Sequence, residues 1–264
     1  MTEAMKRRVL GSTGIEVSPL GLGTVKIGRD QQVKYPTGFK IPDDNAVRDL
    51  FALAWELGIN TLDTAPAYGN SEERLGKLLP HRNDWVIVGK VGEIFENGES
   101  SFDFSAAYTR KSVERSLKRL GRDFIDIMLV HSHGDDMAII EREEVCETLQ
   151  QLKREGLVRA IGMSTKTVEG GIWCVENMDV VMATYNLAYT DELPVLQRAA
   201  ELNKGVLIKK GLQSGHADST AGGGGVEAAL QFVFAQPVHS VVVGTINPKH
   251  LRDNVEVVHR IGAG

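Results

Sequence analysis

Eight short apolar runs alternate along the chain with segments that have helical periodicity. Each run is almost continuously hydrophobic and rich in β-branched residues, which is typical of strands buried on both faces of a parallel sheet. The runs cover residues 19–24, 59–63, 85–90, 124–131, 158–164, 180–186, 205–209 and 240–244. We interpret them as strands that are separated by helices and loops.

The segments between the runs place apolar residues three or four positions apart, as amphipathic helices do. The first helix is expected between Asp43 and Gly58, and the last has Asn247 as its N-cap and Pro248 at its first helical position. Further helices are predicted around residues 113–120, 145–152, 193–200 and 230–234. Glycines at positions 121, 156 and 205 are expected to end the first three of these.

The alternation of strands and helices over this length predicts an α/β fold, namely a (β/α)8 TIM barrel. An open doubly wound sheet is the alternative. Residues 7–17 contain Gly11 and Gly14 between short apolar stretches, and we expect them to form an N-terminal β-hairpin that plugs the bottom of the barrel. Because no linker interrupts the pattern, residues 1–264 are interpreted as a single domain.

The composition argues against several classes of protein. The 30 Lys and Arg residues against 35 Asp and Glu give a net charge of -5, whereas a general nucleic-acid binder carries a basic excess. No apolar run approaches the ~18 residues of a membrane span, and the N-terminus has no signal-peptide pattern. Cys146 and Cys174 lie in apolar helical stretches and make no disulfide framework. We expect a cytoplasmic monomer or weak oligomer without nucleic-acid or membrane partners.

Reactive side chains occur where the predicted strands end. The second strand ends in Asp63, the third in Lys90 and the fourth in His131, and Tyr68 follows Asp63 by five residues. In a (β/α)8 barrel the carboxyl ends of all strands meet on one face, which carries the active site. These four side chains are therefore predicted to converge on one rim.

Each of these residues also has an ordinary structural explanation. Asp63 is a possible N-cap, Lys90 a solvated loop cation, His131 a core histidine and Tyr68 a packing aromatic residue. The combination is more specific than any member. A zinc hydrolase built on His131, His133, Asp135 and Asp136 is a further alternative, but the other strand ends lack ligands and Lys90 would repel a cation.

The four residue types suit the reduction of a carbonyl group. A tyrosine hydroxyl can donate a proton to a developing alkoxide, although its ordinary pKa is ~10. A neighbouring ammonium lowers a phenol's pKa by favouring phenolate, and a buried carboxylate keeps that ammonium charged. A neutral histidine is expected to donate a hydrogen bond to the carbonyl oxygen and so polarise it.

The segment GINTLDTAPAYGNSEERLG at 58–76 resembles the first signature of the aldo-keto reductase superfamily, and Lys90 and His131 fall where the catalytic tetrad of that family requires them. The resemblance extends over residues 9–258. It implies an enzyme with a TIM barrel that uses NADP(H) or NAD(H) to reduce an aldehyde or ketone to an alcohol by reversible hydride transfer. Tyr68 would be the general acid, tuned by Lys90 and Asp63, and His131 would orient the substrate.

The resemblance also implies a cofactor site along the barrel rim. Its expected members are Gly23, Thr24 and Val25 after the first strand, Asp63, Ser164 and Thr165 after the fifth strand, and Lys209, Lys210, Leu212 and Ser214 after the seventh. Ser164 matches the residue that binds the carboxamide, and Lys209 stands where an aromatic residue usually stacks on the nicotinamide. Because oxidised nicotinamide is positively charged, Lys209 is expected to disfavour that form unless its ammonium bends away to the pyrophosphate.

The last loop resembles the family's clamp for the adenosine phosphate. Its expected contacts are Gly244, Thr245, Asn247, His250 and Asn254. The two cations typical of NADP-binding members are replaced by Gly244 and His250, and the helix N-terminus with Lys249 and Arg252 is expected to compensate. NADP(H) is therefore predicted over NAD(H).

Two further expectations complete the interpretation. Some family members accompany ion channels, so the alternative function is a cofactor-binding regulatory subunit with little turnover. The substrate is expected to be a small molecule with a carbonyl group, bound in an open pocket, because the loop after the fourth strand is short. No metal is expected at the site.

Overall fold

The computed structural model describes residues 5–33, 38–213 and 224–264. Eight parallel strands form a closed barrel, in which the last strand pairs with the first, Val242 opposite Gly21. This closure confirms the predicted TIM barrel and excludes the open sheet. Every predicted strand is present within about two residues, and the barrel strands in order of the chain are β3 (Leu20–Gly23), β4 (Thr61–Asp63), β5 (Val86–Val91), β8 (Ile125–His131), β9 (Val158–Ser164), β10 (Val180–Thr184), β11 (Gly205–Lys209) and β12 (Ser240–Val243).

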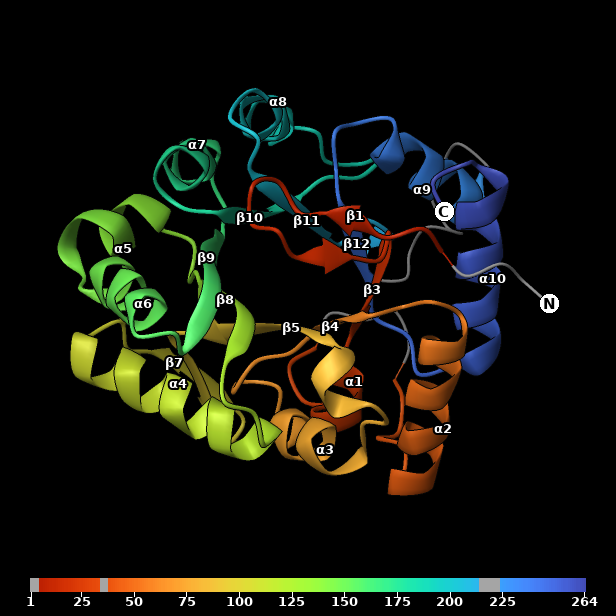
Figure 1. Ribbon diagram of the computed structural model, residues 1–264, viewed down its shortest axis with the longest axis horizontal. Coiled ribbons are helices and arrows are strands. Elements are labelled where there is room, and N and C mark those ends of the chain that lie inside the picture. Colours follow the sequence, from red (N-terminus) through yellow and green to blue (C-terminus); the bar gives the residue numbers. More distant parts are fainter. Residues whose placement is uncertain (1–4, 34–37, 214–223) are drawn as a thin grey trace.

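Helices surround the barrel on its outside (Figure 1). Six of them confirm the predicted helices: α2 (Asp44–Glu56), α4 (Ala106–Leu120), α6 (Val145–Arg154), α8 (Leu193–Glu201), α9 (Gly225–Phe234) and α10 (Pro248–Arg260). Four further helices of the described residues were not predicted: α1 (Val25–Gly28), α3 (Ser71–Leu78), α5 (Asp136–Arg142) and α7 (Val168–Asn177). Among the residues that the structure describes, one 3-10 turn covers Arg82–Asp84.

The sequence of helix α7 explains why this helix was not predicted. Gly170 and Gly171 lie inside it and are poor helix formers. A Cβ at Gly170 would meet the side chain of Asp136 at 2.3 Å, and one at Gly171 would meet Val195 at 2.6 Å. The two glycines therefore let α7 pack closely against α5 and α8, and this tertiary requirement overrides helix propensity.

The role predicted for Gly205 as a helix stop is wrong. Helix α8 ends at Glu201, and the chain turns through Asn203, whose φ is 52°. Gly205 is instead the first residue of β11, and a Cβ there would meet the side chain of Leu10 at 2.6 Å. A glycine occupies position 205 because close packing against the N-terminal segment leaves no room for a Cβ atom.

That segment forms the predicted hairpin. β1 (Arg8–Val9) and β2 (Glu16–Val17) pair in antiparallel register. Leu10, Ile15 and Val17 are fully or almost fully buried, in one cluster with side chains that line the inside of the barrel: Val86, Val88, Ile127, Leu129, Ala160, Val180, Met182 and Leu207. The hairpin therefore plugs one end of the barrel, as expected.

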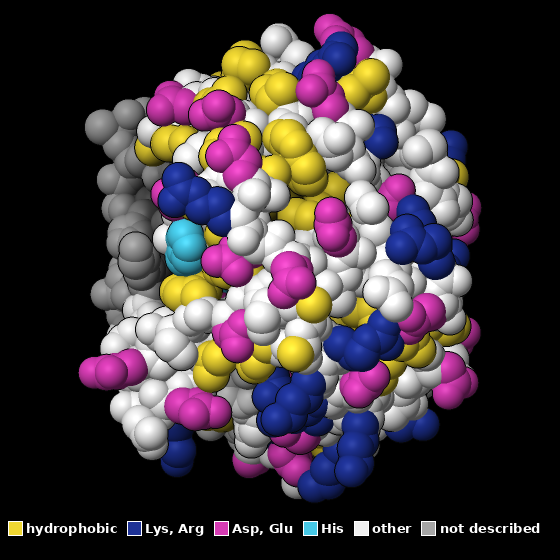
Figure 2. Space-filling model, turned by 90° about the vertical axis from the view of Figure 1, so that its left-hand side faces the viewer, with side chains coloured by type: hydrophobic (Ala, Val, Ile, Leu, Met, Phe, Trp, Pro, Cys, Tyr) yellow, Lys and Arg dark blue, Asp and Glu magenta, His cyan; other side chains and the backbone are white. Residues whose placement is uncertain are grey.

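A larger hydrophobic cluster fills the layer between the barrel and its helices, and it includes both cysteines, which are buried free thiols. Within the described residues no helix is long and apolar enough to cross a membrane. Figure 2 shows the face on the side of α4, α5 and α6, where basic and acidic side chains lie interspersed. The buried and exposed positions thus follow the amphipathic patterns of the sequence.

A second hairpin was not predicted. β6 (Glu93–Glu96) and β7 (Glu99–Phe102) pair in antiparallel register, with Glu93 opposite Phe102. The two strands are short, β6 is half-buried and β7 is exposed, and neither carries a strong apolar alternation. The available signal was Asn97-Gly98, whose φ angles of 54° and 82° form the tight turn that this dipeptide favours. Because β6 follows the carboxyl end of β5 directly, this hairpin rises from the catalytic rim.

The plug yields a test of the fold. Leu10→Ala is expected to lower the free energy of unfolding by about 2–5 kcal/mol, because it leaves a cavity inside the barrel. Val9→Ala is the matched control: Val9 is the neighbouring residue but is 51% exposed, so its stability should hardly change. Urea unfolding followed by circular dichroism measures both, and equal stabilities would contradict the plug.

Candidate active site

The four predicted residues meet at the carboxyl ends of neighbouring strands. Asp63 ends β4 and lies opposite Val88 of β5 in the parallel ladder. Lys90 lies on β5, and His131 ends β8. Tyr68 lies in the turn that follows β4, which leads into α3. The closed barrel thus brings together side chains that are up to 68 positions apart, from Asp63 to His131.

The centre of the site is a buried ion pair. The ammonium of Lys90 donates a hydrogen bond to Asp63 Oδ1 and a second one, of 3.1 Å, to the carbonyl oxygen of Thr64. The side chains of Lys90 and Asp63 are only 2% and 8% exposed. Lys90 is therefore no solvated cation and Asp63 is no helix cap, which removes two of the ordinary structural explanations.

Tyr68 packs against this pair. The Lys90 ammonium lies 4.9 Å from the centre of the Tyr68 ring, and the Tyr68 hydroxyl donates to Asp63 Oδ2 at 3.5 Å. The rings of Tyr68 and His131 stand edge to face, with centroids 6.2 Å apart. One phenol thus contacts a carboxylate, an ammonium and an imidazole, which is the convergence that the sequence predicts.

The turn that carries Tyr68 is held by unusually close backbone packing. A Cβ at Gly28 would lie 2.1 Å from the Tyr68 carbonyl oxygen, and a Cβ at Gly69 would lie 2.0 Å from that of Gly28. Arg29, which is 9% exposed, donates from Nη1 to the Ala67 carbonyl at 3.1 Å. The loop after α1 therefore fixes the position of Tyr68.

A residue that the sequence did not suggest completes the site. Glu93, on β6, places Oε2 2.9 Å from His131 Nδ1. A carboxylate accepts hydrogen bonds and has none to give, so the Nδ1 proton points to Glu93. This contact favours a proton on Nδ1, and the donation of a hydrogen bond from a neutral His131 to a carbonyl stays a prediction. Only the protonated ring has a second N–H.

The zinc alternative does not fit the geometry. His133 packs edge to face against Phe102 and Phe104, at centroid distances of 5.4 and 5.5 Å. Asp135 caps α5 by accepting from Ala138, and Asp136 accepts from the backbone of Thr167. Within the described ranges no three acidic, histidine or cysteine side chains are placed to hold a metal ion.

The carboxamide position predicted at Ser164 is occupied by an unexpected network. Lys209 Nζ donates to Ser164 Oγ at 2.8 Å and to the Thr165 carbonyl at 2.5 Å. The Thr165 hydroxyl is 3.4 Å from a carboxylate oxygen of Glu192, which is 1% exposed. Ser164 keeps its own O–H as a donor, so it fits a carboxamide oxygen, whereas both polar groups of Thr165 are engaged within the protein.

Burial perturbs the two charged members of this network in opposite directions. It lowers the pKa of Lys209 and raises the pKa of Glu192, and each charge partly offsets the effect on the other. The ammonium of Lys209 bends toward Ser164 and Thr165. The neighbour Lys210 is exposed, has a φ of 57°, and its carbonyl accepts from Asn186.

The other predicted cofactor contacts are only partly available. Gly23 pairs with Asp63, Thr24 donates its hydroxyl to the Asp63 carbonyl at 2.8 Å, and Val25 begins α1. Leu212 is partly buried against the core. Ser214 lies outside the described residues.

The last loop keeps an exposed N-terminus on α10. Asn247 caps the helix by accepting from the amide of Lys249 at 2.9 Å, and Thr245 accepts from the amide of Asn247. The ammonium of Lys249 pairs with Asp253 at 2.8 Å, whereas Arg252 is exposed. Gly244 and His250 flank this end, and Asn254 is buried one turn further along. Arg252 and the N-terminus of α10 are therefore the groups at this end that could bind an anion.

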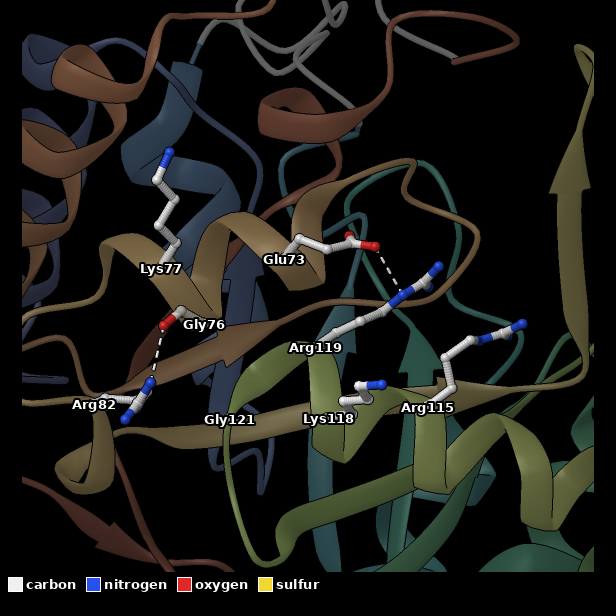
Figure 3. Close-up of a pocket in the computed structure, with 8 residues that line it drawn as sticks. All are labelled: Glu73, Gly76, Lys77, Arg82, Arg115, Lys118, Arg119 and Gly121. Atoms are coloured by element: carbon white, nitrogen blue, oxygen red, sulfur yellow. Dashed lines mark hydrogen bonds and ion pairs between the residues drawn. The ribbon is translucent and has the colours of Figure 1, made fainter.

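A shallow depression of about 590 Å³ lies elsewhere, between α3 and α4 (Figure 3). Most of its basic side chains already have partners. Arg119 pairs with Glu73 at 2.8 Å, and Arg82 donates to the Gly76 carbonyl at 3.0 Å. It contains none of the four predicted catalytic residues, so it belongs to the helical layer and not to the candidate active site.

Comparisons with known proteins identify the family of this chain. The model of the aldo/keto reductase family matches residues 19–220. A solved structure from Pseudomonas aeruginosa, assigned to the aldo-keto reductases, is 54% identical with a TM-score of 0.88 and covers 97% of this chain and 94% of its own. The holo form of aldo-keto reductase AKR11C1 from Bacillus halodurans is 26% identical with a TM-score of 0.81, over 96% and 91% of the two chains.

Among curated proteins, the L-galactose dehydrogenase of Arabidopsis thaliana is 30% identical over 95% of this chain and 87% of its own length. The fold and these relatives define a (β/α)8 oxidoreductase. The chain belongs to the aldo/keto reductase family, and it is an oxidoreductase enzyme.

The buried ion pair can be tested independently of activity. Asp63→Ala is expected to lower the free energy of unfolding by about 3–5 kcal/mol, because it leaves the Lys90 charge buried without its carboxylate. Adding Lys90→Met removes that charge and should recover most of the loss. Urea unfolding of the wild type, the single variant and the double variant measures this, and an unchanged single variant would show that the pair is solvated.

Proposed function

We propose that this enzyme reduces aldehydes or ketones to alcohols reversibly, with a nicotinamide cofactor and with Tyr68 as general acid and base. The observation that carries the proposal is the packing of Tyr68 against the buried Lys90–Asp63 pair, with the ammonium 4.9 Å from the ring. A phenol in contact with a buried cation is stabilised as phenolate, which makes it a better proton donor to an alkoxide.

The residues of this chain divide the work. Asp63 keeps Lys90 charged, and Lys90 favours the phenolate that Tyr68 becomes after it gives up its proton. His131 stands beside Tyr68 and holds the substrate oxygen. When bound, the nicotinamide supplies or accepts a hydride, and Ser164 is the residue best placed to hold its carboxamide.

We propose that the aromatic cluster of Phe102, Phe104 and His133 forms one wall of the substrate pocket. It stands on the hairpin and on the loop that rise from the rim beside His131. Such a wall suits a small carbonyl compound with an apolar part. The pocket would then be less open than the sequence suggested.

Tyr68→Phe tests the proposal. It removes the hydroxyl and keeps the ring, so kcat should fall by ~10²–10⁴-fold, the usual contribution of general acid catalysis. Cofactor affinity, measured by protein fluorescence, should hardly change. The assay is cofactor consumption over a panel of aldehydes, ketones and sugars, and a variant that keeps a third of the activity would refute the role of Tyr68.

The alternative function is a regulatory subunit that binds cofactor with little turnover. It would bind reduced cofactor normally and turn over no carbonyl compound in the same panel. The intact arrangement of Asp63, Lys90, Tyr68 and His131 supports catalysis over this alternative. We therefore propose a single catalytic domain that works in the cytoplasm as a monomer or weak oligomer.

For the cofactor we propose NADP(H) over NAD(H), with a modest preference. The support is Arg252, which is exposed beside the Asn247-capped start of α10, since a cation near a helix N-terminus favours a phosphate. Lys249, which the sequence also suggested, is paired with Asp253 and contributes less.

Lys209 is expected to set the relative affinity for the two redox forms. Its ammonium lies against Ser164 and Thr165, so it opposes a positively charged ring bound there. A unit charge several ångströms away at an effective dielectric of ~20 is worth about 2 kcal/mol. Burial lowers the pKa of Lys209 to about 7, so the full effect is present only below that pH, and Glu192 offsets part of it. Lys209→Met should therefore raise the affinity for oxidised relative to reduced cofactor on the order of tenfold.

Lys210→Met is the matched control, because it removes the same charge one residue further along the chain. Fluorescence titration with the oxidised and reduced forms of both cofactors gives the ratio directly. A ratio that Lys209→Met leaves unchanged would refute the role of Lys209. A clear preference for NADH would refute the phosphate assignment independently.

A further inference from the structure

Lys209 points into the barrel at its rim, in the same layer as the candidate catalytic residues. Leu207 of β11, Val88 of β5 and Leu129 of β8 belong to the hydrophobic cluster inside the barrel. Because successive side chains of a strand point to opposite faces, the residue two positions further along each of these strands also points inward. These residues are Lys209, Lys90 and His131. Lys209 therefore faces the same interior as the groups proposed to bind the carbonyl compound.

The amine of Lys209 is oriented by two acceptors. Nζ donates to Ser164 Oγ at 2.8 Å and to the Thr165 carbonyl oxygen at 2.5 Å. Besides its bond to Cε, a lysine nitrogen has three tetrahedral positions, and these contacts use two of them. Among the described residues no hydrogen-bond acceptor occupies the third position, and the side chain is only partly buried. The third position carries a proton in the ammonium and a lone pair in the neutral amine.

The surroundings of Lys209 favour the neutral amine. Burial lowers its pKa to about 7. The carboxylates of Glu192, which precedes α8, and Asp136, which begins α5, oppose this change. The ammonium groups of Lys210 and Lys166 reinforce it. Near neutral pH a large part of the Lys209 population is therefore uncharged, whereas an ordinary lysine with a pKa of ~10.4 is almost entirely protonated.

The second lysine of the rim is bound differently. Lys90 is 2% exposed and donates to the carboxylate of Asp63 and to the Thr64 carbonyl, so it is an ion-paired cation. Lys209 is instead a partly exposed amine, and it lies close enough to His131 for its charge to lower the pKa of the imidazole. Of these two lysines, Lys209 is therefore the nucleophile that a carbonyl carbon at the rim would meet.

We propose that Lys209 is a covalent modification site for aldehydes, which condense with its amine to an imine when no cofactor is bound. The lone pair of Nζ attacks the carbonyl carbon, and the C=O π bond opens to give a carbinolamine. Loss of water then forms the C=N bond, and the water carries away the carbonyl oxygen together with both amine hydrogens. The reaction needs no oxidant, reductant, cofactor or turnover, so the proposal goes beyond the proposed function.

The imine would change the cofactor site. It removes the two N–H groups that Lys209 donates to Ser164 and Thr165, and it puts the carbon skeleton of the aldehyde beside Ser164. The carboxamide of the nicotinamide is proposed to bind at the same place, so bound cofactor should shield the amine. This mutual exclusion rests on the proposed function, whereas formation of the imine does not.

Reductive trapping on the full chain tests the proposal. The chain without cofactor is incubated near neutral pH with benzaldehyde and sodium cyanoborohydride, which converts an imine into a stable secondary amine, and peptide mass mapping locates the label. The neutral fraction of Lys209 should exceed that of an ordinary lysine on the order of a thousandfold. After allowance for its partial burial, we expect Lys209 to be labelled at least about tenfold faster than Lys210 or Lys90.

Two variants and an internal standard control the experiment. Lys209→Arg keeps a cation with hydrogen-bond donors but forms no imine under these conditions, so the label on this peptide should disappear. Lys210→Met is the matched control, because it removes the exposed neighbouring amine and should change the labelling of Lys209 only slightly. The α-amino group of the chain, with a pKa of ~7.7–8.0, is labelled on a separate peptide in every sample. If Lys209→Arg does not fold, the mass map of the wild type decides.

The effect of the cofactor is measured in Tyr68→Phe, which should bind NADPH without rapid turnover of the aldehyde. Saturating NADPH should protect Lys209 and leave the label on the α-amino group unchanged. A Lys209 that is labelled no faster than Lys210 would overturn the proposal. A label on Lys209 that NADPH leaves unchanged would support the modification site and count against a carboxamide at Ser164. A labelled Lys209 in a chain that turns over no carbonyl compound of the panel would support the site and refute the proposed function.

Discussion

The active site depends on one constraint, namely that an ammonium buried at the barrel rim must have a carboxylate beside it. Lys90 is 2% exposed, and among the described residues its ammonium donates hydrogen bonds to Asp63 and to the Thr64 carbonyl. An unpaired charge in that place would cost several kcal/mol. The parallel register of β4 and β5 supplies the carboxylate, and the packed turn after β4 then lays Tyr68 over the pair. The Lys90–Asp63 contact thus both stabilises the barrel rim and positions the groups of the candidate active site.

Most of the architecture could be predicted from local pattern. Buried parallel strands are continuous apolar runs, so all eight were found, and residues at their carboxyl ends led to Asp63, Lys90 and His131. The elements that were missed obey tertiary rules instead. Helix α7 contains two glycines because its neighbours leave no room for Cβ atoms, and Gly205 serves the packing of Leu10 and does not end a helix. Propensity could not reveal either.

Sequence reasoning missed the site residues whose importance depends on a contact with a residue of another loop or strand. Glu93 is one of many surface-like acidic residues until β6 turns it toward His131, and Glu192 acquires its role only beside Lys209 and Thr165. Lys209 was noticed at its position, but the direction of its ammonium follows from the distance to Ser164. Pairings across different loops of a barrel are set by the closed sheet and not by spacing along the chain.

Arg29 lies where two functions meet. It donates to Ala67 in the turn of Tyr68, pairs with Glu93 and stacks on Phe95 of the hairpin whose far strand carries Phe102. The loop that would shape the substrate pocket therefore shares its anchor with the group that orients His131. Substitutions in this hairpin that are selected for a new substrate range would therefore also disturb the contacts of His131, unless Arg29 keeps the strand in place.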